Sequence, residues 1–109
     1  MRQDLATLKN KSLLLHVVET MDEAKKGYDG IKRKAGEGMF FSFSKTIPLP
    51  ISVGYSGDPL DVAWLQHGMV VAMASHLGGI LISEADAALE LPLGWLKANN
   101  IRLGDRLVI

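Results

Sequence analysis

Cysteine is absent from the 109-residue sequence, and aromatic residues make up only 6% of it. Without cysteine the chain has no disulfide framework, no thiol nucleophile and no thiolate ligand for a metal ion. With so few aromatic residues, few side chains can stack on the bases of single-stranded nucleic acid. The chain is 48% hydrophobic and 22% charged, a composition that folds around a core.

A net charge of either sign is also missing, because 12 Lys and Arg residues balance 12 Asp and Glu residues. The chain therefore lacks the basic footprint of a typical nucleic-acid binder, and we expect no nucleic-acid partner. No stretch approaches the roughly 20 apolar residues of a membrane helix, and no secretory signal opens the sequence. We expect a cytoplasmic or virion location without membrane contact.

Short β-favouring runs separated by turn residues dominate the pattern. They predict strands over residues 12–19, 39–44, 51–55, 62–65, 69–73, 80–83, 87–91 and 107–109. A capping box of Thr20 and Glu23 predicts a short helix from Met21, and a second short helix is expected over residues 93–100. The fold class is mainly β (α+β), a small antiparallel β-barrel or sandwich of about seven or eight short strands with two short helices.

The expected domain organisation is simple, because the length suits one compact domain. Residues 1–11 are interpreted as a polar N-terminal segment and residues 12–109 as a single β-barrel domain. Residues 47–50 are expected to be extended but not a central strand, because Pro48 and Pro50 lack a backbone donor.

The segment from 62 to 73 predicts a tight β-hairpin in which Gly68 takes a positive φ angle. Both faces of this hairpin are apolar over much of its length, so one face needs a cover beyond the usual core. That cover can be a helix of the same chain, another subunit or a protein partner. The residues expected to dock a partner are Trp64, Leu65, Met69, Val71 and Met73 of the hairpin and Lys25, Lys32 and Arg33 of the basic region near the first helix.

Three ordered pieces of the sequence resemble a known family. They are residues 17–27, then Gly38-Met39-Phe40-Phe41 followed by residues 45–49, then Ala88-Leu89-Glu90-Leu91 followed by Gly94-Trp95 and residues 100–107. Together they are similar to the prokaryotic domain-of-unknown-function 192 family over roughly residues 14–109. The resemblance implies a small β-barrel with one or two packed helices and no established reaction. It also implies that some relatives are encoded by bacteriophages.

The family usually carries an aromatic-Met-Lys-Asn-Thr motif before Ile-Pro-Leu-Asp. Here residues 43–46 keep the lysine and threonine of that motif, while Pro50 stands where the family has Asp. The resemblance therefore makes Lys45 and Thr46 the candidate ligand-binding residues and implies that the rest of the polar motif is eroded.

Other chemistries have little support in the sequence. His67 and His76 could ligate a metal with Glu84 or Asp86, but their spacing matches no compact metal motif. No Gly-x-Ser-x-Gly elbow accompanies the serines, so a nucleophilic hydrolase is not indicated. We expect no metal site, no cofactor and a protein that is not an enzyme.

The function expected from these features is that of a non-enzymatic binding or structural module that acts through protein–protein contacts or self-association. A bacteriophage virion or assembly component is the specific form expected. The alternative is a small-ligand-binding protein or an enzyme with its site around Lys45 and Thr46.

Overall fold

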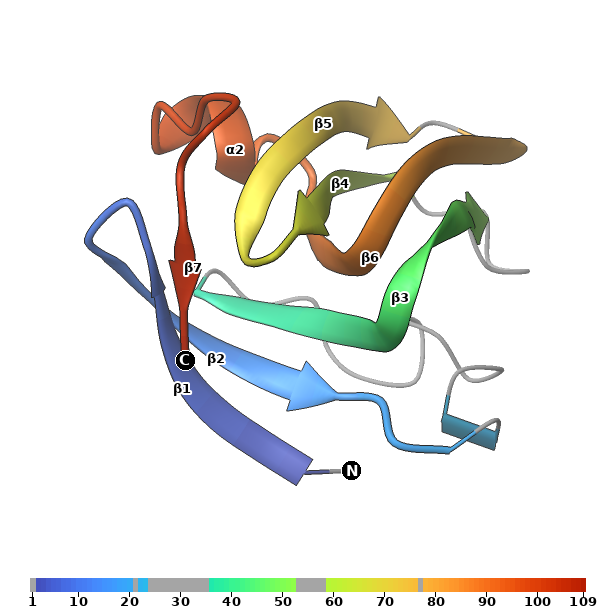
Figure 1. The fold of residues 1–109 in the computed structure, drawn as a ribbon. Coiled ribbons are helices and arrows are strands. Elements are labelled where there is room, and N and C mark those ends of the chain that lie inside the picture. Colours follow the sequence, from blue (N-terminus) through green and yellow to red (C-terminus); the bar gives the residue numbers. More distant parts are fainter. Residues whose placement is uncertain (1, 21, 24–35, 53–58, 77) are drawn as a thin grey trace.

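The computed structural model describes residues 2–20, 22–23, 36–52, 59–76 and 78–109. Seven strands form one sheet in the order β5-β4-β6-β3-β2-β1-β7 (Figure 1). Their bounds are β1 Arg2–Leu8, β2 Lys11–Val17, β3 Glu37–Ser52, β4 Leu60–Gln66, β5 Met69–His76, β6 Ile80–Pro92 and β7 Leu107–Val108. A four-residue helix, α2, covers Trp95–Ala98. The mainly β class is thus confirmed.

The sheet curls until its two end strands approach each other. Neighbouring strands are antiparallel except β2 and β3, which are parallel. At the closing edge Met69 forms an isolated bridge with Arg106, and the Val70 N–H donates to the Asp105 carbonyl at 2.9 Å. The curl places one cluster of core residues inside the sheet and a second cluster on its other face.

The prediction for the N-terminus differs from the structure. Residues 2–8 were expected in a polar segment outside the domain, but they form β1, which pairs with β2 along its whole length. Ala6 and Leu8 are buried in the inner core, while Leu5 and Thr7, which alternate with them, are exposed. The polar residues of this strand therefore form the outer face of a half-buried strand.

The separation of residues 80–83 and 87–91 into two strands was wrong, since they belong to the single 13-residue strand β6. Residues 39–44 and 47–52 likewise share strand β3, with a register shift between Ser42 and Ile47. Within the described residues, β3 pairs with β2 only through Glu37–Phe40, so the segment with Pro48 and Pro50 pairs with β6 alone. An extended, non-central strand with two prolines fits this arrangement.

Two local predictions are confirmed. The Glu23 N–H donates to Thr20 Oγ1 at 3.1 Å and the Thr20 N–H donates to Glu23 Oε1 at 3.2 Å, which is the expected capping box. Asp22 and Glu23 are helical, and Met21 and residues 24–35 lie outside the described part of the chain. The hairpin turn has φ 51° at His67 and 79° at Gly68, as a two-residue turn with positive φ at both positions requires.

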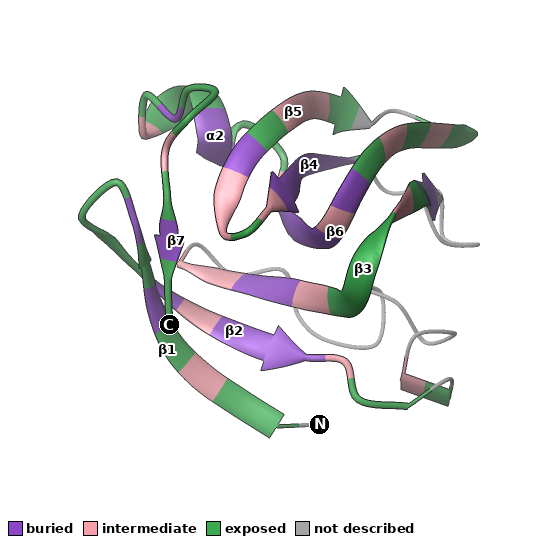
Figure 2. Cartoon of the chain, viewed as in Figure 1, coloured by how far each residue is buried: buried purple, intermediate pink, exposed green. Residues whose placement is uncertain are grey.

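The core explains why β4 is apolar on both faces. Ala63 and Leu65 belong to the inner cluster, whereas Val62 and Trp64 belong to the cluster on the other face with Leu49 of β3. Figure 2 shows β4 buried over nearly its whole length between β5 and β6. The cover that the hairpin needed therefore comes from the chain itself. Among the described residues no helix is long and apolar enough to cross a membrane.

Candidate functional site

Strand β5 lies at one end of the seven-strand order and pairs with β4 on one side. On the other side of β5, the connection between α2 and β7 covers the start of the strand. The Gly104 N–H donates to the Val70 carbonyl at 2.8 Å, and the Asp105 carbonyl accepts the Val70 N–H. Among the described residues, no further backbone bond covers this outer edge beyond Val70. Figure 1 shows the second half of β5 running along the rim of the sheet.

The open edge exposes specific backbone groups. Antiparallel pairs alternate between residues that bond to the partner strand and residues whose N–H and C=O point away from it. The backbone N–H and C=O of Val70 point away from β4. The register shift lies between Val70 and Ala72, so Val71 has no residue of β4 opposite it. The alternation then directs the N–H and C=O of Met73 and Ser75 outward.

The side chains of β5 carry no formal charge apart from the terminal histidine, and they include neither proline nor glycine. Natural edge strands are normally protected against strand addition by charge, proline or a bulge. The only such device here is the bulge at Val71, whose side chain is 39% exposed. Met69 and Met73 are half-buried. Of the predicted docking residues, Val71 and Met73 therefore lie on the open part of β5, and Met69 lies on its covered part.

The other predicted docking residues lie elsewhere. Trp64 and Leu65 are 3% and 0% exposed, so they are core residues and cannot contact a partner in this fold. The Trp64 Nε1 donates to the Leu49 carbonyl at 3.0 Å, which fixes the ring in the core. Lys25, Lys32 and Arg33 lie outside the described residues.

A cavity of about 300 Å³ borders the open half of β5. Its apolar walls are Met73 on one side and Leu96 and Ile101 on the other, and Lys97 also lines it. The carboxylate of Asp61 belongs to the same cavity, but both of its oxygens are bonded, one to Ser75 Oγ and one to the Leu96 N–H, each at 3.0 Å. The cavity thus lies between the edge strand on one side and α2 and Ile101 on the other.

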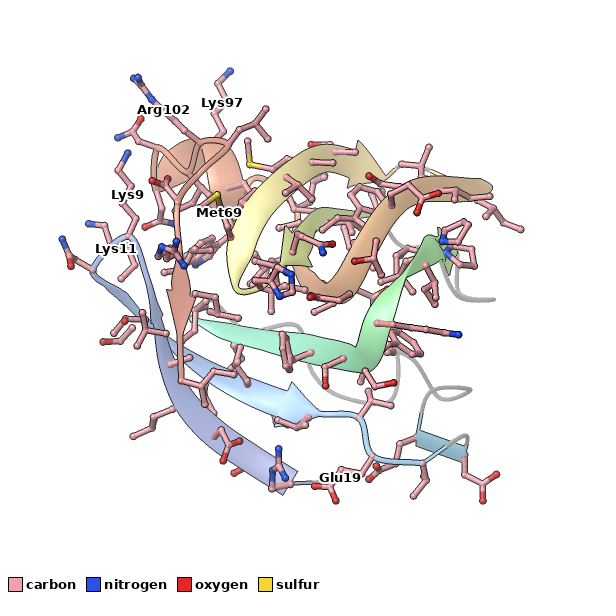
Figure 3. The ribbon with its side chains drawn as sticks, viewed as in Figure 1. Lys9, Lys11, Glu19, Met69, Lys97 and Arg102 are labelled. Carbon is pink, nitrogen blue, oxygen red and sulfur yellow. The ribbon has the colours of Figure 1, made fainter. Side chains whose placement is uncertain are left out.

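Cations lie where the β1–β2 turn meets the connection between α2 and β7. Lys97 is exposed on α2, Arg102 is exposed on that connection, and Lys9 and Lys11 flank the β1–β2 turn (Figure 3). Lys9 Nζ bonds the Asn100 carbonyl and lies 4.0 Å from Asp105 Oδ2, so the two connections meet. We call Lys9, Lys11, Lys97 and Arg102 the basic end.

The predicted ligand residues Lys45 and Thr46 lie on β3, where Lys45 is exposed. Thr46 Oγ1 accepts a hydrogen bond from Gln66 Nε2. His67 follows Gln66, and its backbone N–H donates to Asp86 Oδ2 at 3.0 Å, while its Nδ1 lies 3.5 Å from the same oxygen. The fold therefore gathers Thr46, Gln66, His67 and Asp86 into a polar cluster from three strands and a turn.

That cluster does not form the metal site considered from the sequence. The described residues contain no group of three or more His, Asp or Glu side chains placed to hold a metal ion. The side chain of His76 lies outside the described part of the chain. Asp86 instead supports the two-residue turn through the His67 N–H.

Sequence reasoning did not identify Asp61 of β4 and Glu90 of β6 as buried, although they are 2% and 4% exposed. His16 was expected to be half-buried in the sheet; it is 8% exposed, and its Nε2 lies 2.9 Å from Glu37 Oε1 across the parallel β2–β3 pair. Nothing in the local sequence marks Asp61 and Glu90 as buried, since single polar residues in strands usually face solvent.

Comparison with known proteins gives a family and a fold. The sequence model of the domain-of-unknown-function 192 family, described as "Uncharacterized ACR", matches residues 5–109. The chain matches no curated protein. A crystal structure of a "putative transcription regulator" from Sinorhizobium meliloti is similar, with a TM-score of 0.87 and 21% identity over 97% of this chain and 92% of that one.

A second crystal structure, of a protein of unknown function from Novosphingobium aromaticivorans, has a TM-score of 0.79 and 18% identity. It covers 98% of this chain and 85% of that one. At these identities the two likenesses support the fold alone. They carry no activity, ligand or partner over to this chain.

Proposed function

We propose that this chain, which belongs to the domain-of-unknown-function 192 family, is a non-enzymatic binding module that acts through protein–protein contacts. The observation that carries the proposal is the open second half of β5, an edge strand with no charged residue and no proline. Extended segments bind such edges by adding a strand, because the unpaired N–H and C=O groups supply hydrogen bonds of fixed spacing.

The surrounding structure supports this edge as a docking strand. The first part of β5 is held by Gly104 and Asp105, so the open part extends from a fixed start. The strand also pairs with the fully packed β4, whose side chains are in the core on both faces. An added strand therefore finds a rigid template, which lowers the ordering cost of binding.

Selection of binding peptides tests the proposal. Purified protein is used to select from a displayed library of random peptides, and the selected peptides are measured against wild type, Met73→Pro and Met73→Ala. Proline removes the outward N–H, whereas alanine removes the same side chain and keeps that N–H. We expect affinity to fall at least tenfold in Met73→Pro relative to Met73→Ala.

A second experiment is available if Met73→Pro does not fold. The selected peptides are then synthesised with one N-methylated amide each and measured on the wild-type protein, and loss of binding at alternate amides supports strand addition. The proposal fails if no peptide is enriched above a column without protein, or if Met73→Pro and Met73→Ala bind alike. A dimer that Met73→Pro dissociates would also support protein–protein contact through this edge.

The polar cluster favours a second candidate, a small-ligand site around Lys45 and Thr46. The supporting observation is the bond from Gln66 Nε2 to Thr46 Oγ1 beside His67 and Asp86. A thermal-shift screen of small anions and sugars on wild type and Thr46→Ala tests it. A thermal shift that is lost in Thr46→Ala supports the site, and equal thermal shifts of wild type and Thr46→Ala exclude it.

A role as a bacteriophage virion or assembly component stays a prediction.

A further inference from the structure

The cavity beside the open half of β5 lies on the face of the strand that carries the side chains of Met73 and Ser75. Both residues line it, and Met73 also packs against the inner core. The backbone N–H and C=O groups of the same two residues point to the open edge. This pair of residues therefore supplies both the hydrogen-bonding groups for an added strand and one wall of the cavity.

Strand geometry decides which side chains of an added segment reach the cavity. Residues directly opposite each other on neighbouring strands point their side chains to the same face of the sheet. The segment residues opposite Met73 and Ser75 therefore point toward the cavity, and the residue between them points to the other face. Pockets that take alternate side chains in this way give strand addition its specificity.

The walls of the cavity favour an apolar side chain. Met73, Leu96 and Ile101 supply its apolar surface. The one carboxylate among its described lining residues, that of Asp61, has both oxygens bonded within the protein, so it requires no polar group from a partner. Lys97 is exposed and is the only member of the basic end that lines the cavity. An exposed lysine keeps its ammonium group in water while its alkyl chain contacts an apolar neighbour.

The size of the cavity suits one side chain. Its volume of about 300 Å³ is at the lower end of the range for pockets that hold whole small molecules. Resting on the proposed function, we infer that the occupant is an extended segment of another protein whose residue opposite Met73 is a large apolar anchor, such as leucine or phenylalanine, that enters the cavity. A single buried anchor of this kind supplies a large share of the affinity of an interface.

A second copy of the chain fits the cavity less well. When two β5 edges pair antiparallel around a two-fold axis, each copy uses the same patch, so the residues offered to the partner's cavity are again Met73 and Ser75. Met73 already packs against the inner core of its own copy, and the Ser75 hydroxyl is bonded to Asp61. A second copy therefore has no apolar side chain on this edge to place in the cavity.

An alanine scan of a selected peptide tests the inference. The tightest peptide from the displayed library is synthesised with each residue replaced in turn by alanine, and its affinity for the wild-type protein is measured by fluorescence anisotropy. We expect one apolar position at which alanine weakens binding at least tenfold, and losses below threefold at the two adjacent positions. Raising the salt from low to physiological concentration should change the affinity less than twofold, because the anchor is uncharged.

A substitution in the cavity wall connects that position to the cavity. Two versions of the peptide, with leucine or phenylalanine as the anchor, are measured on wild type and on Ile101→Ala, which enlarges the cavity. The leucine peptide should lose affinity several-fold on Ile101→Ala, and the phenylalanine peptide should lose less. The control is Leu103→Ala on the same connection, because Leu103 is 63% exposed and does not line the cavity. Should Ile101→Ala fail to fold, Ile101→Val replaces it, with a smaller shift in the same direction.

The outcomes separate this inference from the proposed function. Peptides that lose binding in Met73→Pro but have no single sensitive apolar position overturn the anchor and leave the docking edge in place. The same holds if Ile101→Ala and Leu103→Ala affect the two peptides alike. A dimer seen by analytical ultracentrifugation that Met73→Pro dissociates overturns the anchor in favour of a second copy. A library selection that enriches no peptide overturns both.

Discussion

The hydroxyl of Ser75 donates to Oδ1 of Asp61 across the β4–β5 pair, with 3.0 Å between Oγ and Oδ1. The second oxygen of this carboxylate accepts the Leu96 N–H, so a single buried side chain connects β5 to α2. The separation between strand and helix, and hence the width of the cavity, depends on Asp61.

Removing this carboxylate should loosen the fold. Asp61→Ala leaves the buried Leu96 N–H without its acceptor, and each such loss costs about 1–3 kcal/mol. We expect the free energy of unfolding in urea to fall by about 2–4 kcal/mol, since two bonds are lost. Ser75→Ala, which removes one donor at an exposed position, should cost about 1 kcal/mol or less. Equal losses in the two variants would contradict the role of Asp61 as the link.

The first strand offers a matched pair of leucines. Leu8 is fully buried, whereas Leu5 is 77% exposed on the same strand. Leu8→Ala should lower the free energy of unfolding by about 2–5 kcal/mol, the range for a buried leucine that leaves a cavity. Leu5→Ala should change it by no more than about 0.5 kcal/mol. Similar midpoints for both variants in urea would mean that β1 does not belong to the core.

Gly38 is expected to tolerate no side chain. A Cβ atom at this position would lie 2.9 Å from the Glu90 carbonyl oxygen and 2.9 Å from Leu91 Cδ2. Gly38→Ala therefore has to separate β3 from β6, and overpacking of this kind costs about 1–3 kcal/mol. The reduction should appear as a lower Tm in calorimetry. An unchanged Tm would show that β3 and β6 can move apart at Gly38 without loss of stability.

Gly36→Ala provides the comparison for a strained backbone without a clash. Gly36 has φ +80° and open space around its Cβ position. A non-glycine residue in this region costs about 1–2 kcal/mol. Leu91→Ala removes one of the two contacts at the Gly38 Cβ position, so in a double-mutant cycle Gly38→Ala should cost less in the Leu91→Ala background than in wild type, whereas the cost of Gly36→Ala should be the same in both.

The capping box predicts a pH dependence. The Glu19 backbone N–H donates to Glu23 Oε1 at 2.8 Å and, with the Thr20 N–H, lowers the pKa of the Glu23 carboxyl below its ordinary value. The folded state thus favours the ionised carboxylate. Its stabilising contribution is present above the unfolded-state pKa and is lost as the pH falls through the lowered folded-state pKa.

Titration of the Glu23 carboxyl carbon by NMR checks this pKa. Glu19→Pro removes the donating N–H and should return the pKa toward its ordinary value. Glu19→Ala keeps that N–H and should keep the pKa low. The same titration midpoint in both variants would show that another group sets the pKa.

The features predictable from the sequence are those set by neighbours along the chain. Thr20 and Glu23 are three residues apart, so their reciprocal bonds follow from local geometry alone. The hairpin turn follows from Gly68, because glycine accepts the positive φ that a two-residue turn needs. The family resemblance added the barrel-like architecture and was confirmed by the match over residues 5–109.

The features that were missed depend on distant partners. Residues 2–8 look polar and pair with the adjacent β2 along their whole length, and Thr7 and Leu8 also pair with β7 from the far end of the chain. Trp64 looked available for docking, but Leu49 of the long strand β3 accepts its indole N–H and covers it. The length of β3 and β6 could not be predicted, because charged residues such as Glu84 and Asp86 occupy outward positions without ending the strand.

The pairing of β1 with β7 has a kinetic consequence. Thr7 and Leu8 face Val108 and Leu107, so residues at opposite ends of the sequence complete one edge of the sheet. Among the strand pairings of the described residues, this one joins the residues most distant in sequence, and loop closure of that length slows folding. During synthesis, β1 emerges long before its β7 neighbour, and the sheet can be completed only after Leu107 and Val108 have left the ribosome.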